Sequence, residues 1–278
     1  MPSPQDVSAR RRAFRDLHAS GCFAIPNPWD PGSALYLEKL GFRALATTSS
    51  GAAWRHAKAD GQMTVEEVLL HLREMVAATR LPVNADFEGG FAEDAAGVAR
   101  NVRLAIETGV AGLSIEDSTG EPDVPLRDLP DAVERMRAAR AAIDAAGGET
   151  LLVGRAENFI VGRPDLDDAI RRLRAYAEAG ADCLYAPGIK TREQIAAVVA
   201  AVAPKPVNLL IGFATELTLH DIEALGVRRV SVGGALARTA WGGFMRTAET
   251  IAREGRFDGF AAAASGAELN RLFRGDRS

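Results

Sequence analysis

The chain has 278 residues, 47% of them hydrophobic, and carries a formal net charge of −4 at pH 7. This length and composition suffice for one large domain with a single core. The interspersed charges predict neither a nucleic-acid surface nor a basic membrane patch, and no segment has the character of a membrane span or a signal peptide.

The two cysteines, Cys22 and Cys183, both lie within apolar segments. Reduced thiols in a hydrophobic core are typical of intracellular proteins, because disulfides form mainly in oxidising compartments. We therefore expect a cytoplasmic protein.

Strand-like and helix-like segments alternate along nearly the whole chain. Residues 3–20 are predicted to form a helix, and the tail from about residue 256 to 275 contains a further one. Glycines that suit a left-handed helix cap, such as Gly41, Gly109, Gly180 and Gly226, end several of the helices between them. Eight short apolar segments are predicted strands: residues 22–28, 44–50, 82–87, 112–117, 151–157, 183–188, 206–211 and 228–234.

Eight strand–helix units predict a (β/α)8 TIM barrel. A doubly wound open sheet is the alternative, but the count of eight and the absence of an early Gly-rich dinucleotide motif favour the barrel. We predict one domain over residues 1–278, with an N-terminal helix at 1–21, the barrel at 22–255 and a C-terminal helical tail at 256–278. The extra C-terminal helix is expected to pack on a neighbouring subunit.

Polar residues gather at the predicted strand ends, where barrels of this kind place their active sites. Asp86 and Glu88 are two residues apart, so an extended chain directs both side chains to one face. Further candidates follow the other strands: Ser49, Ser50, Gly51, Arg55, His56, Asp60, Glu116, Asp117, Arg155, Glu157, Tyr185 and Asn208.

Carboxylates that converge on one barrel mouth cannot all stay ionised without a positive charge among them. Because the candidate ligands are all oxygens, a hard divalent ion fits, Mg²⁺ ahead of Mn²⁺. Since Mg²⁺ keeps several waters, only one carboxylate need touch it. The alternative is that these acids cap helices or pair with arginine.

Two further features predict an anion site. Arg155 could grip a substrate carboxylate, neutralise Glu116 or Glu157, or do both. The turn at residues 50–52 offers a hydroxyl and backbone amides. Gly233 and Gly234 after the last strand could bind phosphate or serve only a tight turn.

The segments "SSG", "ADFEGGF", "IED" and "GRAENF" lie at the second to fifth predicted strands in this order. Their combination resembles the isocitrate lyase/phosphoenolpyruvate mutase superfamily. The resemblance implies that Asp86 touches the metal, that Glu88 holds a metal-bound water, and that Glu116 and Asp60 lie close by. It also implies that Ser50, Gly51 and Ala52 hold the substrate carboxylate, and that subunits of a homotetramer or homodimer exchange the C-terminal helix.

The resemblance further implies a Mg²⁺-dependent enzyme that acts on 2-oxo acids, of the pyruvate, glyoxylate, oxaloacetate or 2-oxoglutarate class, or on their precursors. Arg155, Glu116 and Tyr185 are the predicted catalytic residues, and Asn208 is a predicted substrate contact. An enolate-like intermediate would be stabilised by the metal and Arg155. Cleavage of a C–C bond is the preferred reaction, including decarboxylation of an oxaloacetate-like acid.

Two departures from the superfamily leave alternatives open. The Lys-Lys-Cys-Gly-His loop of isocitrate lyases is missing, and so is the Lys/Pro/Asn-rich gating loop of the mutases. Tyr185 and His56 are the remaining candidates for proton transfer, although the first could simply pack and the second could lie in solvent. Phosphonate chemistry and a non-catalytic, metal-dependent 2-oxo acid binder are the alternative functions.

Overall fold

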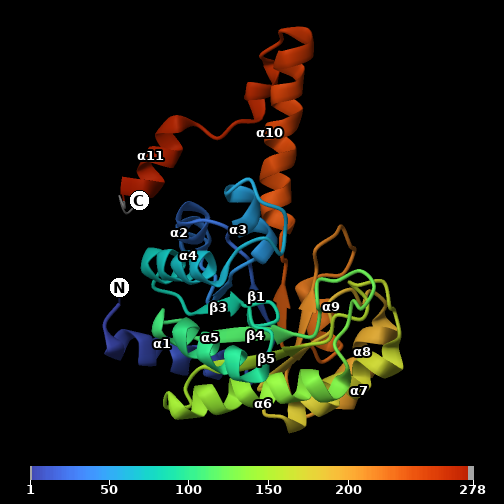
Figure 1. The fold of residues 1–278 in the computed structure, drawn as a ribbon. Coiled ribbons are helices and arrows are strands. Elements are labelled where there is room, and N and C mark those ends of the chain that lie inside the picture. The colour runs from blue at the N-terminus through green and yellow to red at the C-terminus, as the bar shows by residue number, and fades with distance from the viewer. Residues whose placement is uncertain (1, 275–278) are drawn as a thin grey trace.

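The computed structural model describes residues 2–274, in which eight parallel strands form one sheet in the order β1-β8-β7-β6-β5-β4-β3-β2 (Figure 1). β1 pairs with β8, and the Ala46 amide donates to the Pro26 carbonyl over 3.1 Å where β1 and β2 face each other. The sheet is therefore a nearly closed barrel, and the predicted (β/α)8 fold is confirmed. The strands are β1 Phe23–Ile25, β2 Leu45–Ala46, β3 Val83–Asp86, β4 Gly112–Glu116, β5 Leu151–Arg155, β6 Cys183–Tyr185, β7 Val207–Leu210 and β8 Arg229–Ser231.

Each strand lies within its predicted segment and is shorter than predicted, because the last residues of each segment turn into the following loop. The helices surround the barrel, and side chains of Ser, Thr or Asp cap most of their N-termini. They are α1 Pro4–Leu17, α2 Pro31–Lys39, α3 Ser49–Arg55, α4 Val65–Ala78, α5 Ala95–Glu107, α6 Leu129–Ala145, α7 Leu166–Glu178, α8 Arg192–Val202, α9 Leu219–Ala224, α10 Ala235–Glu254, η1 Asp258–Ala262 and α11 Gly266–Arg274.

A glycine is required where α7 turns into β6. Gly180 has a φ of +104°, and a Cβ there would come within 2.5 Å of the Arg140 side chain. Both the left-handed backbone and the close packing exclude other residues. The prediction that this helix ends at Gly180 is confirmed.

The alternation of side chains along the strands creates two cores. Outward residues such as Leu113, Ile115 and Leu152 pack under the helices, whereas inward residues such as Ile25 and Val153 fill the barrel. α1 crosses the N-terminal end of the barrel and places Phe14, which is fully buried, against the inner core. The barrel is therefore sealed at one end and open at the end where the strands finish.

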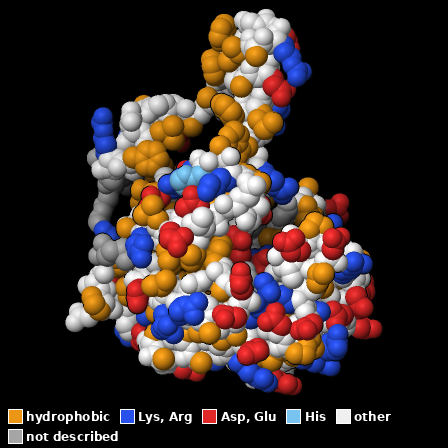
Figure 2. Space-filling view, in the orientation of Figure 1, with side chains coloured by type: hydrophobic (Ala, Val, Ile, Leu, Met, Phe, Trp, Pro, Cys, Tyr) orange, Lys and Arg blue, Asp and Glu red, His pale blue; other side chains and the backbone are white. Residues whose placement is uncertain are grey.

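The C-terminal part of the chain forms an arm that leaves the barrel (Figure 1). α10 projects outward and buries only Ala237, so the projection begins earlier than the tail predicted from residue 256. α11 returns to α2, where a Cβ on Gly32 would lie 3.3 Å from the Phe273 ring. Figure 2 shows apolar side chains gathered on the arm; the exposed large ones include Trp241, Phe244, Met245, Phe257 and Phe260.

The last four residues of the predicted tail lie outside the described residues. Among residues 2–274, no helix combines the length and the hydrophobicity needed to cross a membrane.

Candidate active site

Four neighbouring strands end in charged or phenolic side chains that point into the barrel mouth. The registers align Glu116 with Arg155 and Arg155 with Tyr185, and Asp86 ends the adjacent strand β3. Inward residues of neighbouring strands lie side by side, so these four side chains are brought together. The predicted convergence at the strand ends is confirmed for them.

Arg155 lies at the centre of the carboxylates. Its Nη1 atom is 2.8 Å from Asp86 Oδ1 and 3.1 Å from Glu116 Oε2, and its Nε atom donates to Glu157 Oε1 over 2.7 Å. Although burial opposes the charge, Glu116, Glu157 and Asp86 hold the pKa of Arg155 well above its usual value. The guanidinium carbon also lies 5.0 Å from the centre of the Tyr185 ring. Arg155 therefore pairs with the neighbouring acids, which is one of its two predicted roles; binding of a substrate carboxylate is the other.

The acids at the mouth carry more negative charge than one arginine balances. Burial, followed by the charges of Asp86 and Asp60, raises the pKa of Glu88 to about 8. Burial likewise raises the pKa of Asp60, and it raises that of Glu116 well above the usual value although Arg155 opposes the rise. The site thus carries excess negative charge, which a bound cation would compensate.

This donor set fits a hard divalent cation, because it consists of carboxylate oxygens whose charges repel one another. Within residues 2–274, no three Asp, Glu, His or Cys side chains are arranged to hold an ion together. Asp86 as the direct ligand, with Glu88, Glu116 and Asp60 around it, stays a prediction.

The segment from Ser49 onward begins a helix, which corrects the prediction of a strand up to residue 50 followed by a loop turn. Thr48 caps α3: its hydroxyl accepts from the Gly51 amide over 3.4 Å, and its carbonyl accepts from the Ala52 amide over 3.0 Å. The Ser49 amide donates to Asp86 Oδ2 over 3.1 Å. Of the predicted anion cradle, only Ser50 faces the cavity.

Two adjoining cavities open at the barrel mouth. One of about 200 Å³ runs into the barrel, and one of about 400 Å³ lies above the ends of β3 and β4. Ser49, Asp60, Arg155 and Ile160 line both, so the predicted acids and the arginine share one connected space.

The chain matches the family model described as phosphoenolpyruvate phosphomutase over residues 14–252. It belongs to this family. A candidate lyase/mutase from Burkholderia cenocepacia J2315 is 47% identical, with 97% of this chain and 98% of that one covered and a TM-score of 0.94. The 2,3-dimethylmalate lyase, a PEP mutase/isocitrate lyase superfamily member, is 26% identical over 98% and 95% of the two chains, with a TM-score of 0.84. Oxaloacetate decarboxylase of Rhodopseudomonas palustris (strain BisA53) is 31% identical over 280 residues, with 96% and 93% covered. The predicted superfamily of enzymes is thus confirmed.

Neither cysteine of this phosphomutase-family chain reaches the site. Cys183 is fully buried inside the barrel, and burial raises the pKa of its thiol. Cys22 precedes β1 at the opposite end, where burial raises its pKa to about 11. His56 ends α3 as an exposed residue and lines neither cavity. Tyr185 therefore stays the better-placed candidate for proton transfer.

Asn208 is placed deeper than predicted. It is fully buried, its Oδ1 accepts from Arg229 Nε over 2.8 Å, and its Nδ2 donates to Ser231 Oγ over 2.9 Å. It lines neither cavity, so this placement does not support a direct contact with substrate.

One polar residue at the barrel mouth escaped the sequence analysis. Asn27 follows β1, and its Oδ1 accepts from the Val232 and Gly233 amides over 2.8 and 2.9 Å. This side chain uses amides that a phosphate would need, so the glycine pair serves a tight turn here. The position of Asn27 just after the first strand could have indicated from the sequence that its side chain lies at the barrel mouth.

Asp117 was expected among the acids of the barrel mouth, but it lines neither cavity and its role is structural. It is 1% exposed; its Oδ1 accepts from the Glu157 amide over 2.8 Å, and its Oδ2 accepts from Tyr176 over 2.6 Å and pairs with Arg172 over 3.0 Å. Asp117 therefore fixes the backbone beside the Arg155 cluster without entering the cavity.

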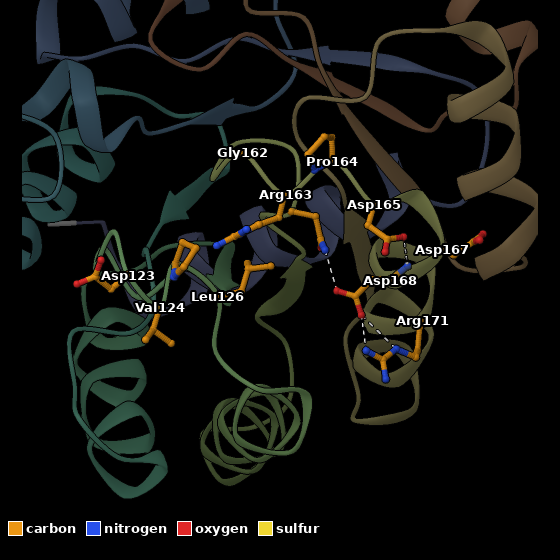
Figure 3. Close-up of a pocket in the computed structure, with 12 residues that line it drawn as sticks. Asp123, Val124, Leu126, Gly162, Arg163, Pro164, Asp165, Asp167, Asp168 and Arg171 are labelled. Carbon is orange, nitrogen blue, oxygen red and sulfur yellow. Dashed lines mark hydrogen bonds and ion pairs between the residues drawn. The ribbon is translucent and has the colours of Figure 1, made fainter.

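A larger groove of about 910 Å³ lies beside the site, between the loop after β4 and the loop after β5 (Figure 3). Its Asp168 is engaged by Arg171, Arg172 and Asn158. None of the strand-end acids lines it, so the groove is separate from the candidate site.

Proposed function

We propose that this chain is a metal-dependent carbon–carbon lyase acting on a 2-oxo acid or its precursor, with decarboxylation of an oxaloacetate-like acid as the preferred reaction. The observation that carries the proposal is the Arg155 cluster, in which one guanidinium and three carboxylates meet at the floor of an open cavity. The resemblance to an oxaloacetate decarboxylase and to 2,3-dimethylmalate lyase supports this reaction class.

Mg²⁺ is the proposed cation, with Mn²⁺ as a substitute, held by Asp86 and surrounded by Glu88, Glu116 and Asp60. When bound, it would act as a Lewis acid that stabilises negative charge on a carbonyl oxygen. The remaining steps depend on side chains of the chain itself.

Arg155 lines both cavities and can donate to an oxygen on which charge develops, as an enolate-like intermediate requires. Glu116 holds this guanidinium in place through its contact with Nη1. Burial raises the pKa of Tyr185 to about 12, so its phenol keeps the proton at neutral pH and can deliver it to a carbanion.

Water would be excluded by the loop after β4. Its Ser118 and Leu126 form an antiparallel bridge, and Ser118, Thr119 and Gly120 line the outer cavity. Ile160, from the loop after β5, lines the same space. A closed loop would protect an enolate-like species from premature protonation by solvent.

The test measures Mg²⁺-dependent pyruvate formation from oxaloacetate, together with oxalate binding by calorimetry. We expect the EDTA-treated protein to regain both on addition of Mg²⁺, and Asp86→Asn to lose both. Asp16→Asn, an exposed residue of α1 at the other end of the barrel, is the matched control and should behave as wild type.

Three outcomes contradict the proposal. Oxalate binding without turnover of any 2-oxo acid indicates a binder. Turnover of phosphoenolpyruvate, detected by phosphorus NMR, indicates C–P chemistry. Metal-independent activity removes the assigned role of Asp86.

We also propose that the arm packs on a second copy of this chain, in a homodimer or homotetramer. Phe244 and Met245 on α10 are 63% and 52% exposed, an unusual state for such large apolar side chains.

A further inference from the structure

The barrel interior beneath the Arg155 cluster is unusually polar. Interiors of this fold are normally packed with branched aliphatic side chains. Here the inward positions of β3, β4, β7 and β8 carry polar groups instead, and all of them are buried: Asn84, Ser114, Asn208, Arg229 and Ser231.

Arg229 is the charged member of this set, and it is 2% exposed. Its Nε donates to Asn208 Oδ1 over 2.8 Å, and its Nη1 lies 3.4 Å from Asn84 Oδ1 and 3.5 Å from His18 Nε2. Its guanidinium carbon lies 6.0 Å from the centre of the Phe14 ring. Every one of these partners is an uncharged group.

His18 does not supply a counter-charge. Its Nδ1 lies 2.7 Å from the Phe14 carbonyl and must be protonated to donate there, so Nε2 presents a lone pair to Arg229. Burial and the charge of Arg229 lower the pKa of His18 to about 3.

Arg229 is thus a buried cation without an anionic partner. None of the ion pairs found within residues 2–274 includes it, whereas the buried Arg155 and Arg172 each contact carboxylates. Burial lowers the pKa of Arg229, and the nearby Cys183 and Tyr185 oppose this shift. A buried charge in this position is costly unless an anion accompanies it.

A cavity reaches this guanidinium. The space of about 200 Å³ is lined by Arg229, Ser114 and Ser231 as well as by Tyr185 nearer the mouth. Ser231 Oγ accepts from Asn208, so its own proton is left to donate, either to the Tyr185 hydroxyl or to a group in the cavity. The inner end is therefore surrounded by donors.

Two carboxylates, Asp60 and Asp86, line the same cavity at its outer end. Asp86 does not dominate the inner end, because Oδ1 is bound by Arg155 and Oδ2 by the Ser49 amide. Arg229 is the charged residue that lines the inner part.

We propose that the inner end of this cavity is an anion site, where Arg229 and the hydroxyls of Ser231 and Tyr185 bind one small anion. The anion is either free chloride or a carboxylate group of the ligand that occupies the mouth. The volume excludes larger anions such as nucleotides. The site does not depend on the proposed reaction, because it is defined by charge and hydrogen-bond donors alone.

The test is anomalous diffraction from crystals of the full chain soaked in bromide, which replaces chloride. We expect an anomalous peak within about 3.5 Å of the Arg229 guanidinium, the reach of a hydrogen bond to a large anion. Arg229→Lys should retain the peak and Arg229→Met should lose it. If the Met variant does not fold, the wild-type crystal still decides.

A second crystal, grown without halide and soaked with oxalate and Mg²⁺, distinguishes the two sources. If an oxalate carboxylate lies next to Arg229 in this crystal, the ligand is the source of the anion. If oxalate lies only at the mouth here while the first crystal shows bromide at Arg229, the anion is free halide. Water alone beside Arg229 in both crystals, or bromide only on surface arginines, would overturn the proposal. If no anion is found at Arg229, the proposed turnover of oxaloacetate is still tested separately by the pyruvate assay.

Discussion

The charge balance at the barrel mouth makes a quantitative prediction for Glu88. In the metal-free protein we expect Glu88→Gln to be more stable than wild type at alkaline pH. Gln keeps the size of the side chain, and at a backbone φ of +43° it suffers the same strain as Glu, so only the charge changes.

The magnitude follows from the pKa of about 8, compared with an ordinary value of 4.5. The native state keeps this proton between the two values while the unfolded chain releases it, so the free energy of unfolding falls as pH rises from about 4.5 to about 8. At ~1.36 kcal/mol per pKa unit the loss reaches at most about 5 kcal/mol, and partial solvent access to the carboxylate reduces it.

The assay is thermal unfolding in EDTA from pH 5 to pH 9. The two proteins should melt together at pH 5, and the variant should melt several degrees higher at pH 8.5. Glu93→Gln, an exposed carboxylate on the same loop, is the control and should show no such gap. Saturating Mg²⁺ should close the gap, because a cation makes the ionised Glu88 favourable. Equal melting temperatures across the range without metal would refute the reasoning.

Three further changes test other parts of the molecule. Asp117→Asn should lower the free energy of unfolding by about 3–5 kcal/mol in urea titrations, because the buried Arg172 loses its partner; a loss below 1 kcal/mol would contradict this. Phe244→Asp on the exposed face of α10 should reduce the mass measured by light scattering to that of a smaller assembly, and an unchanged mass would rule out this contact. Tyr185→Phe should lower kcat for oxaloacetate by about 10²-fold or more if the phenol transfers a proton. An unchanged kcat would mean that Tyr185 only packs against Arg155 and transfers no proton.

The barrel could be predicted because its signals are local. Each strand is an apolar segment of a few residues, and glycines such as Gly180 mark the helix ends. The alternation of side chains then directs Asp86, Glu116 and Arg155 to the interior, so their convergence follows from strand order alone.

The same alternation could have sorted the remaining acids. Glu116 points into the barrel, so Asp117, the next residue, must point away from the mouth and toward the helices. Its contacts with Arg172 and Tyr176 on α7 are the result. Strand parity therefore separates a cavity acid from a structural one without any coordinates.

Depth along the barrel was not predictable in this way. Asn208 and Arg229 share the inward parity of the active-site residues, and the registers pair Tyr185 with Asn208 and Asn208 with Arg229, yet both side chains are buried inside the barrel. Barrel strands tilt against the barrel axis, so paired residues lie at different depths, and the sequence does not encode this tilt directly. The start of α3 was missed because β-branched Thr47 and Thr48 favour a strand, whereas the Thr48 hydroxyl caps the helix.

The layers of charge along the barrel axis would allow a site rich in acids to accept the proposed acidic substrate. Glu88 and Glu116 line the outer cavity, Arg155 lies where the two cavities meet, and Arg229 lies at the inner end. A carboxylate that enters would meet negative charge first, so its binding would depend on the proposed cation at the rim. Beyond the rim the two arginines would attract it, and the hydrogen bonds of Arg155 to Asp86 and Glu157 would keep that guanidinium in place. The acids thus orient the arginine in addition to any metal they bind, which is why three of them contact a single guanidinium.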